Sequence, residues 1–276
     1  MDPQTSNNAS TSQSGSKFLT GKVALVTGSS RGIGEGIALH LAELGASIVV
    51  VYASNLTKAK DVVEKINKLG SHAIALQCNV SKPNEIVKLF ENAIAHFGKL
   101  DIVLSNAGVE AWAKEDDVTQ EMFDRVFNIN CRGQFFVAQQ GYKYLSRGGR
   151  IILTSSIAAQ MHGVPNHSLY AGSKAAVEGF ARSFAKDCGP KAITCNAIAP
   201  GGVMSDMFHE NAWHYAPNGT PDIPVQEIEA KLASMNPLGR VASAKDIAKC
   251  VGLLCHPDSE WINGQTLLMS GGSGNS

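Results

Sequence analysis

From Lys22 onward, short apolar runs rich in β-branched residues alternate with amphipathic stretches. The apolar runs lie at 22–27, 47–52, 73–78, 101–105, 150–154, 193–199 and 266–269. The amphipathic stretches lie at 34–44, 56–68, 83–97, 120–145, 170–188 and 244–254. Such alternation predicts a parallel sheet with helices on both faces and right-handed crossovers. We therefore expect an α/β fold, a doubly wound parallel sheet, with ligands bound beyond the carboxyl ends of the strands.

The length and charge of the chain limit the number of domains it can form and the classes of partner it can bind. With 276 residues, of which 44% are hydrophobic, the chain has enough apolar material for one large domain. We expect that domain at 19–276, after a disordered tail at 1–18 that is rich in Ser and Asn. Lys and Arg total 24, as do Asp and Glu, so no overall field attracts nucleic acid or a membrane surface. A small, nearly neutral substrate is the better match.

Cysteine usage and hydropathy bear on the compartment. The six cysteines are scattered through apolar segments without the paired spacing of a metal site, which predicts buried thiols in a reducing cytosol. The tail lacks the apolar core of a signal peptide, and no run of about 18 apolar residues appears. We therefore expect a cytoplasmic protein without a bound metal and without a membrane span.

One long segment breaks the alternation. Between Gly201 and Arg240 the chain carries Met, Trp, His, Tyr, Pro and Gly residues but no strand pattern. Connections of this length are usually functional or disordered. We predict a lid over the substrate at about 203–240, because large apolar side chains there are costly to leave in water. A surface insertion without function is the alternative.

A glycine-rich turn follows the first predicted strand and opens the first predicted helix. Glycines allow a tight turn and a close approach of the backbone to a pyrophosphate, which the N–H groups of the helix N-terminus then stabilise. The strand before the turn and the helix after it supply the context that the motif needs. The expected contacts are Gly28, Ser30, Arg31, Gly32, Ile33 and Gly34.

The residues after the second predicted strand indicate which dinucleotide binds. A site for NAD usually places a carboxylate there, but this chain reads Tyr52-Ala53-Ser54-Asn55. A 2′-phosphate would meet no repulsion, and Arg31 offers a positive charge and a fork of donors. We therefore predict NADP(H) as the cofactor, although an exposed Arg in a loop is often only a solubilising residue.

Tyr170 and Lys174 lie four residues apart, on one face of a predicted helix. A free tyrosine has a pKa near 10, and we expect the neighbouring ammonium to lower the pKa of Tyr170. The phenol can then give a proton to a carbonyl oxygen or take one back. Taken alone, such a pair is common on any helix.

Four ordered motifs make the chain recognisable. They are TGSSRGIG, the turn Asn106-Ala107-Gly108, YAGSK and the turn Pro200-Gly201, and together they resemble the short-chain dehydrogenase/reductase family over about 21–272. The resemblance implies a Rossmann-type fold and nicotinamide chemistry. It makes Tyr170 the general acid/base and Lys174 its partner and a donor to the nicotinamide ribose. It also implies Ser156, rather than the adjacent Ser155, as the donor to the substrate oxygen.

The same resemblance assigns further positions. Asn130 would hold a water that leads from the lysine toward solvent, with satisfaction of helix backbone as the alternative. The asparagine of the NAG turn would bond neighbouring backbone. Asn79 stands where the family usually has Asp, and its amide would contact the adenine. The remaining implied cofactor contacts are Val80, Ala107, Gly108, Pro200, Gly201, Val203 and Ser205, with Ser205 in place of the more usual Thr.

Within the family, segments such as VPNHSLYAGSKAA and HYAPNG most resemble fungal naphthol reductases and related polyketide (anthraquinone-type) reductases. This implies NADPH-dependent reduction of the keto tautomer of a polyhydroxylated aromatic ring in secondary metabolism. Aromatic and thioether side chains suit a flat substrate. Besides Ser156, the predicted contacts are Met161, His162, Met207, Trp213, Tyr215 and Met235, each of which has core packing as its alternative.

Two other functions stay open at this stage. One is a 3-oxoacyl-carrier-protein or general ketone/steroid reductase, which would want a basic patch for its acidic carrier. The other is a regulator that senses NADP(H) without catalysis, whose signature would be the loss of Tyr170 or Ser156. The family resemblance also implies a homotetramer formed through the helices near 120–145 and 170–188 and the C-terminal strand.

Overall fold

The computed structural model describes residues 17–161 and 164–273. The tail expected at 1–18 lies outside these ranges except for its last two residues. Phe18 packs against the core, with its ring centroid 4.6 Å from that of His256. The domain therefore begins at least one residue earlier than the sequence predicts.

Seven parallel strands form one sheet, in the order β3-β2-β1-β4-β5-β6-β7. This order places the first strand near the middle and reverses direction between β1 and β4, where a crevice opens at the carboxyl ends. The strands are buried because they carry nearly continuous Val, Ile, Leu and Ala, as parallel strands covered on both faces require. Their bounds are β1 Val23–Val26, β2 Ser47–Tyr52, β3 Ala73–Gln77, β4 Leu100–Ser105, β5 Leu145–Thr154, β6 Thr194–Pro200 and β7 Thr266–Met269.

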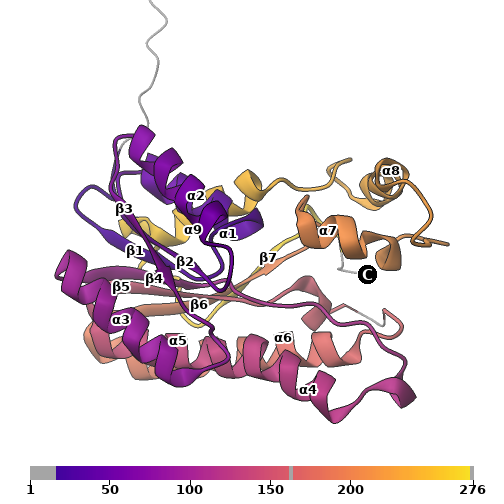
Figure 1. Ribbon diagram of the computed structural model, residues 1–276, viewed down its shortest axis with the longest axis horizontal. Coiled ribbons are helices and arrows are strands. Elements are labelled where there is room, and N and C mark those ends of the chain that lie inside the picture. The colour runs from indigo at the N-terminus through magenta and orange to yellow at the C-terminus, as the bar shows by residue number, and fades with distance from the viewer. Residues whose placement is uncertain (1–16, 162–163, 274–276) are drawn as a thin grey trace, which may run out of the picture.

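Helices cover both faces of this sheet (Figure 1). One layer comprises α1 Gly32–Glu43, α2 Leu56–Lys68 and α9 Ala244–Cys255. The other comprises α3 Pro83–Phe97, α4 Gln120–Phe127, α5 Gln134–Tyr144 and α6 Ser168–Cys188. Each layer closes its own apolar core against one face of the strands, with Ile37 and Val50 in the first and Phe90 and Val103 in the second. The sequence prediction of an α/β, doubly wound parallel sheet is confirmed.

The segment 120–145 differs from the single helix that its sequence predicts. A π-helical turn, Asn128–Gly133, separates α4 from α5. A π turn often marks a functional site, because it re-aims one side chain of a helix. Here the turn buries Asn130 completely, against the loop that follows β4. The next strand, β5, begins at Leu145 rather than at Arg150. Leu145 pairs with Leu100 of β4, and the register shifts before Arg150 pairs with Ile102.

The segment 203–240, hereafter the cover segment, is helical where the sequence showed no pattern. It contains α7 Asp206–Asn211, a 3₁₀ turn Ala212–Tyr215 and α8 Val225–Met235. A small core of its own, with Phe208, Ala212, Ala216 and Ile228 buried, holds these pieces together. Figure 1 shows α7 and α8 beyond the ends of β6 and β7, apart from the two main helical layers. The helices were missed because each is short and buries only one residue.

The structure bears on the expectations for the cysteine thiols and for membrane-spanning helices. Five of the six thiols are buried and Cys250 is half-buried, and burial raises the pKa of Cys78 to about 12. Among the described residues, no helix is both long and apolar enough to cross a bilayer.

Candidate active site

A cleft of about 1450 Å³ opens at the carboxyl ends of the strands, between the glycine turn and the cover segment. Residues predicted to hold a dinucleotide line one part of it, and residues predicted to touch a substrate line another. The predicted cofactor contacts along the cleft are Gly28, Ser30, Arg31, Gly32, Ile33, Ala53, Ser54, Asn55, Asn79, Val80, Asn106, Ala107, Gly108, Tyr170, Lys174, Pro200, Gly201, Val203 and Ser205. Tyr52 and Gly34 do not line it, because Tyr52 lies in the core on the α1 side of the sheet and Gly34 packs against Gly28 and Asn106.

The glycine turn requires glycine for two reasons. Gly28 has φ +63°, and a Cβ there would stand 2.9 Å from Ala107 Cα. A Cβ at Gly34 would collide with the carbonyl oxygen of Gly28 and reach within 2.6 Å of Asn106 Nδ2. That amide donates to the backbone oxygens of Thr27 and Gly28, so Asn106 ties the end of β4 to the turn. These contacts hold a compact turn at the N-terminus of α1, where free backbone N–H groups suit a pyrophosphate.

Two cations lie at the outer end of the cleft, close to Ser54 and Asn55. Arg31 Nη1 is 2.8 Å from Asp206 Oδ2, and Lys58 Nζ is 3.5 Å from the same oxygen. Arg31 was predicted from sequence, whereas Lys58 was missed. Asn55 accepts a bond from Lys58 N and caps α2, which fixes the first turn of that helix beside Arg31. No carboxylate follows β2 directly, but Asp206 of the cover segment links the two cations.

The predicted adenine contact is held rigidly. Asn79 Oδ1 accepts from Ser81 N and Ser81 Oγ at 3.0 and 2.8 Å, which leaves the amide nitrogen for a ligand. Val80 packs on the π turn, where a Cβ on Gly133 would come within 2.9 Å of its carbonyl oxygen. Both residues line the cleft.

Tyr170 and Lys174 lie side by side on α6 and are almost completely buried. Lys174 Nζ donates to the carbonyl oxygen of Thr154 at 2.9 Å and lies 5.5 Å from the centroid of the Tyr170 ring. Burial lowers the pKa of Lys174 to about 8. Burial also raises the pKa of Tyr170, and the Glu110 carboxyl adds to the rise.

The expectation that Lys174 lowers the pKa of Tyr170 is therefore wrong in this structure. The phenol is withdrawn from water, which penalises the phenolate, and Lys174 is not among the groups that shift this pKa. Only the hydrogen bond with Ser156 acts in the opposite direction. The Tyr170 phenol therefore stays protonated and can donate its proton.

The two adjacent serines have different environments. Ser155 is buried, and its hydroxyl donates to Lys174 O at 3.0 Å and also lies 3.1 Å from Glu178 Oε1. Ser156 accepts from Ala158 N at 3.2 Å and bonds to Tyr170 on the cleft side. Ser156 is therefore the serine placed to meet a ligand oxygen.

Asn130 makes a two-way contact with the loop after β4. Its Oδ1 accepts from Val109 N at 2.9 Å, and its Nδ2 donates to Val109 O at 2.8 Å and to Ser173 Oγ at 3.0 Å. It does not line the cleft. A Cβ on Gly108 would lie 3.3 Å from both Asn130 Oδ1 and Lys174 Nζ, so Asn130 is packed beside the lysine.

A column of stacked rings supports the cleft wall beside Tyr170, and His214 is its member that lines the cleft. The indole of Trp112 lies between His167 and His214, with ring centroids 3.8 Å away on both sides. His214 stacks in turn on Trp213 at 3.5 Å, and His167 lies 4.7 Å from the Tyr170 ring. The column joins the loop after β4, the start of α6 and the cover segment.

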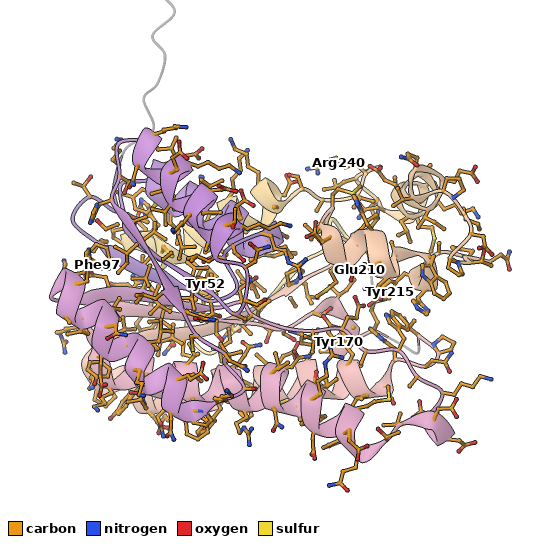
Figure 2. All side chains as sticks on the ribbon, viewed as in Figure 1. Tyr52, Phe97, Tyr170, Glu210, Tyr215 and Arg240 are labelled. Atoms are coloured by element: carbon orange, nitrogen blue, oxygen red, sulfur yellow. The ribbon has the colours of Figure 1, made fainter. Side chains whose placement is uncertain are left out.

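Three polar groups meet beside this column. The Tyr215 hydroxyl oxygen lies 2.6 Å from Glu110 Oε1 and 2.8 Å from His167 Nε2. Burial raises the pKa of Glu110 and lowers that of His167 to about 4. Figure 2 labels Tyr215 of the cover segment just above Tyr170 of α6, and both residues line the cleft.

The residues predicted to touch a substrate divide into two groups. Met161, Met207, Tyr215 and Met235 line the cleft with Ser156. Trp213 does not line it, because its ring stacks on His214 and its indole N–H donates to Glu210 O at 3.2 Å. Trp213 therefore packs the wall from behind, which corrects the sequence interpretation. His162 lies outside the described residues.

Sequence analysis missed Glu110, Trp112, His167 and His214. Glu110 was detectable in principle, since a carboxylate directly after the turn at the end of β4 points into the ligand end of the sheet. His167, three residues before Tyr170, likewise begins the catalytic helix. Nothing in the sequence pairs them with Trp112 and His214, because those contacts depend on how two loops fold.

Known proteins resemble the chain over nearly its whole length. A family model described as Enoyl-(Acyl carrier protein) reductase matches residues 28–273. A hydroxynaphthalene reductase-like protein from Metarhizium robertsii is 59% identical over 257 residues, 93% of this chain and 96% of that protein. A tetrahydroxynaphthalene reductase from Pestalotiopsis fici is 59% identical over 252 residues, 91% of each chain.

Solved structures agree with these relatives. A crystal structure of an angucycline C-6 ketoreductase with bound NADP superimposes with a TM-score of 0.83 at 36% identity, covering 94% of this chain and 98% of that one. A short-chain dehydrogenase from Burkholderia cenocepacia in complex with NADP gives 0.83 at 34% identity, covering 92% and 98%. Together with the fold and the ordered motifs, these matches show that the chain belongs to the short-chain dehydrogenase/reductase family of oxidoreductases.

Proposed function

We propose that this protein is an NADPH-dependent reductase of a polyhydroxylated aromatic polyketide, acting on the keto tautomer of a hydroxynaphthol or hydroxyanthraquinone in fungal secondary metabolism. The observation that carries the proposal is the buried, protonated Tyr170, which lies with Ser156 in the cleft beside a wall of stacked rings. The similarity to two fungal proteins named for hydroxynaphthalene and tetrahydroxynaphthalene substrates supports it.

The cleft fits NADP(H). Its glycine turn offers bare backbone for the pyrophosphate, and Arg31 and Lys58 offer positive charge for a 2′-phosphate. Asn79 and Val80 are assigned to the adenine, and Val203, Ser205 and the Pro200-Gly201 turn to the carboxamide end. The relatives with bound NADP support this choice. The cofactor supplies the hydride that reduces the carbonyl carbon.

The protein's own groups manage the proton and the developing charge. Tyr170 gives its proton to the carbonyl oxygen, and Ser156 donates a hydrogen bond to the same oxygen. Lys174 orients the nicotinamide ribose through its ammonium group, which lies 5.5 Å from the centroid of the Tyr170 ring. Asn130 supports Lys174 by fixing the loop beside it. The family resemblance also implies that Asn130 holds a water molecule there.

The wall selects flat substrates. Tyr215 and the stacked rings behind it offer an aromatic surface, while Met161, Met207 and Met235 offer thioethers that adapt to ring edges. The cover segment, which carries Met207, Tyr215 and Met235, would act as the lid over this pocket. A planar ring system fits such a surface better than a flexible acyl chain does.

Purified protein mixed with NADPH and tetrahydroxynaphthalene or a hydroxyanthraquinone tests the proposal by absorbance of NADPH. We expect cofactor oxidation and a secondary alcohol identified by mass spectrometry. Faster turnover of a 3-oxoacyl thioester would favour the acyl-carrier reductase that the family model's description names. Tight NADPH binding without oxidation by any cyclic ketone would favour a cofactor sensor.

Two further proposals concern the state of the protein in the cell. We place it in the cytoplasm, since that compartment supplies NADPH and keeps thiols reduced. We also propose a homotetramer, because α4, α5 and β7 leave large apolar side chains exposed. These include Phe123, Phe135 and Leu268.

A further inference from the structure

Glu110 is a buried carboxyl group that has no cationic hydrogen-bond partner among the residues that the structure describes. Its side chain is 8% exposed, and it lines the cleft close to Tyr170. Among the described residues, its contacts within hydrogen-bond or ion-pair range are the Tyr215 hydroxyl at 2.6 Å and His167 Nε2 at 3.7 Å, both at Oε1. Burial of an unpaired carboxylate is costly, so the group must either be neutral or gain a partner.

Counting protons along this contact chain decides between these possibilities. His167 Nδ1 lies 3.3 Å from the carbonyl oxygen of Ala111, which can only accept, so the proton of the neutral ring belongs on Nδ1. His167 Nε2 is then an acceptor and needs the Tyr215 proton. That leaves Tyr215 without a proton for Glu110 Oε1, although the two oxygens are 2.6 Å apart.

Each of the three contacts has one donor proton if Glu110 is protonated. Glu110 then donates to the Tyr215 oxygen, Tyr215 donates to His167 Nε2, and His167 Nδ1 donates to Ala111 O. The groups whose charge bears on Glu110 are Lys174 of α6 and Glu210 of α7, which act in opposite directions. The raised pKa of Glu110 and the lowered pKa of His167 agree with a neutral acid and a neutral ring.

One oxygen of Glu110 remains for a ligand. No hydrogen bond joins Oε2 to any part of the chain that the structure describes, and Oε2 is absent from the fully buried side-chain atoms that lack a partner. Oε2 therefore keeps some exposed surface, on a residue that lines the cleft. In a neutral acid whose proton sits on Oε1, Oε2 is a carbonyl oxygen and can only accept.

We propose that Glu110 is a specificity-determining residue, whose Oε2 accepts a hydrogen bond from a ring hydroxyl of the substrate remote from the reacting carbonyl. This inference rests on the proposed function and names the substrate group that the cleft reads. As a carboxylate, Glu110 would raise the pKa of Tyr170 and oppose the phenolate formed when the proton leaves, and a proton on Glu110 removes that contribution. Substrates without that hydroxyl leave the oxygen without a donor.

The kinetic test compares tetrahydroxynaphthalene with a trihydroxynaphthalene that lacks one of its hydroxyl groups. In Glu110→Leu we expect kcat/KM for the tetrahydroxy substrate to fall about 10-fold more than for the trihydroxy one, the worth of one hydrogen bond. Glu110→Gln should keep the wild-type preference, because its amide can donate to Tyr215 and turn its carbonyl to the cleft. Glu91→Leu, at an exposed glutamate on α3, is the matched control.

The outcomes separate this inference from the proposed function. Absence of turnover of both naphthols by the wild-type enzyme would overturn both. Wild-type turnover with an unchanged preference in Glu110→Leu would overturn the assignment of Glu110 alone. A loss of preference in Glu110→Gln equal to that in Glu110→Leu would also overturn it, since a carboxylate rather than a neutral acid would then be needed.

A second measurement does not depend on turnover or on the folding of the leucine variant. The infrared difference spectrum of wild type minus Glu110→Gln at neutral pH should show the carbonyl band of a protonated carboxylic acid, which shifts in D₂O. A carboxylate band at this position instead would overturn the proton assignment. The thermal midpoint of Glu110→Gln should stay close to that of the wild type.

Discussion

At the scale of single residues, the site depends on burial more than on the pairing of charges. Tyr170 and Lys174 are both nearly inaccessible, and burial is the largest cause of the shift in each pKa. The phenol is kept protonated, and the pKa of the lysine is lowered to about 8, close to neutral pH. A reductase that gives a proton to a carbonyl needs the first of these, and the second makes Lys174 sensitive to mild alkali.

The pH profile of reduction follows from these two directions. Because the pKa of Lys174 is lowered to about 8, the ammonium is present below that pH and is lost as the pH rises through it. Tyr170, whose pKa is raised, keeps its proton over the same range. We expect kcat/KM for the proposed ketone to fall above about pH 8, as measured by initial rates of NADPH oxidation. A rate that is level up to pH 10 would contradict this assignment.

The identities of the residues with fixed motif spacing were the part of the site that the sequence predicted best. Tyr170, Lys174 and Ser156 belong to motifs of fixed spacing within one helix and its preceding loop, and the structure brings all three to the cleft. Glu110 and His167 could not be paired in advance, because they are 57 positions apart and both bond to Tyr215 of the cover segment. The direction of the Tyr170 pKa shift was missed because burial cannot be read from helical spacing.

At the scale of elements, the turn between β1 and α1 is the proposed binding site for the cofactor's phosphates. The strands that position it were predictable because their apolar runs are continuous. The π turn was not, since its sequence is compatible with an ordinary helix. The short helices of the cover segment were not predictable either, because they pack mainly on each other.

The choice of NADPH over NADH is expected to depend on two cations from two elements. Arg31→Ala should raise the KM for NADPH more than that for NADH, and Lys58→Ala should act in the same direction, since both lie beside Ser54 and Asn55. Steady-state kinetics with both cofactors measure this. Lys68→Ala, at the far end of α2, is the control. Equal changes for the two cofactors would remove Arg31 from the phosphate site.

The packing of the turn predicts a stability effect. Gly34→Ala places a Cβ against the Gly28 carbonyl and Asn106, and we expect it to lower the free energy of unfolding by about 1–3 kcal/mol. Urea denaturation followed by circular dichroism measures the change. Gly179→Ala on α6 is the matched control, because the nearest atom to its Cβ would be 3.9 Å away. Equal stability of the two variants would show that the turn relaxes easily.

At the scale of the whole molecule, apolar side chains remain on the outer face of the α4–α6 layer. Phe135 is 37% exposed and contacts the rings of Phe180 and Phe184 on α6. Such a patch of neighbouring rings on one face is typical of a surface that a second copy covers. The balanced charge of the chain does not oppose self-association.

Light scattering on a sizing column tests the proposed homotetramer. We expect four chains per particle for the wild type and a smaller particle for Phe135→Glu, because a buried charge at an interface is costly. Leu69→Glu, at a similarly exposed position at the end of α2, should leave the mass unchanged. A wild-type particle of one chain would contradict the proposal.

The central claim is that Tyr170 protonates a carbonyl oxygen while a hydride from NADPH reaches the carbon. The most direct measurement uses NADPH deuterated at the transferable position together with tetrahydroxynaphthalene, and follows deuterium in the product by mass spectrometry. The account predicts one deuterium in the alcohol formed by the wild type and no product from Tyr170→Phe, although that variant binds NADPH as tightly. Labelled alcohol formed by Tyr170→Phe at the wild-type rate would contradict it.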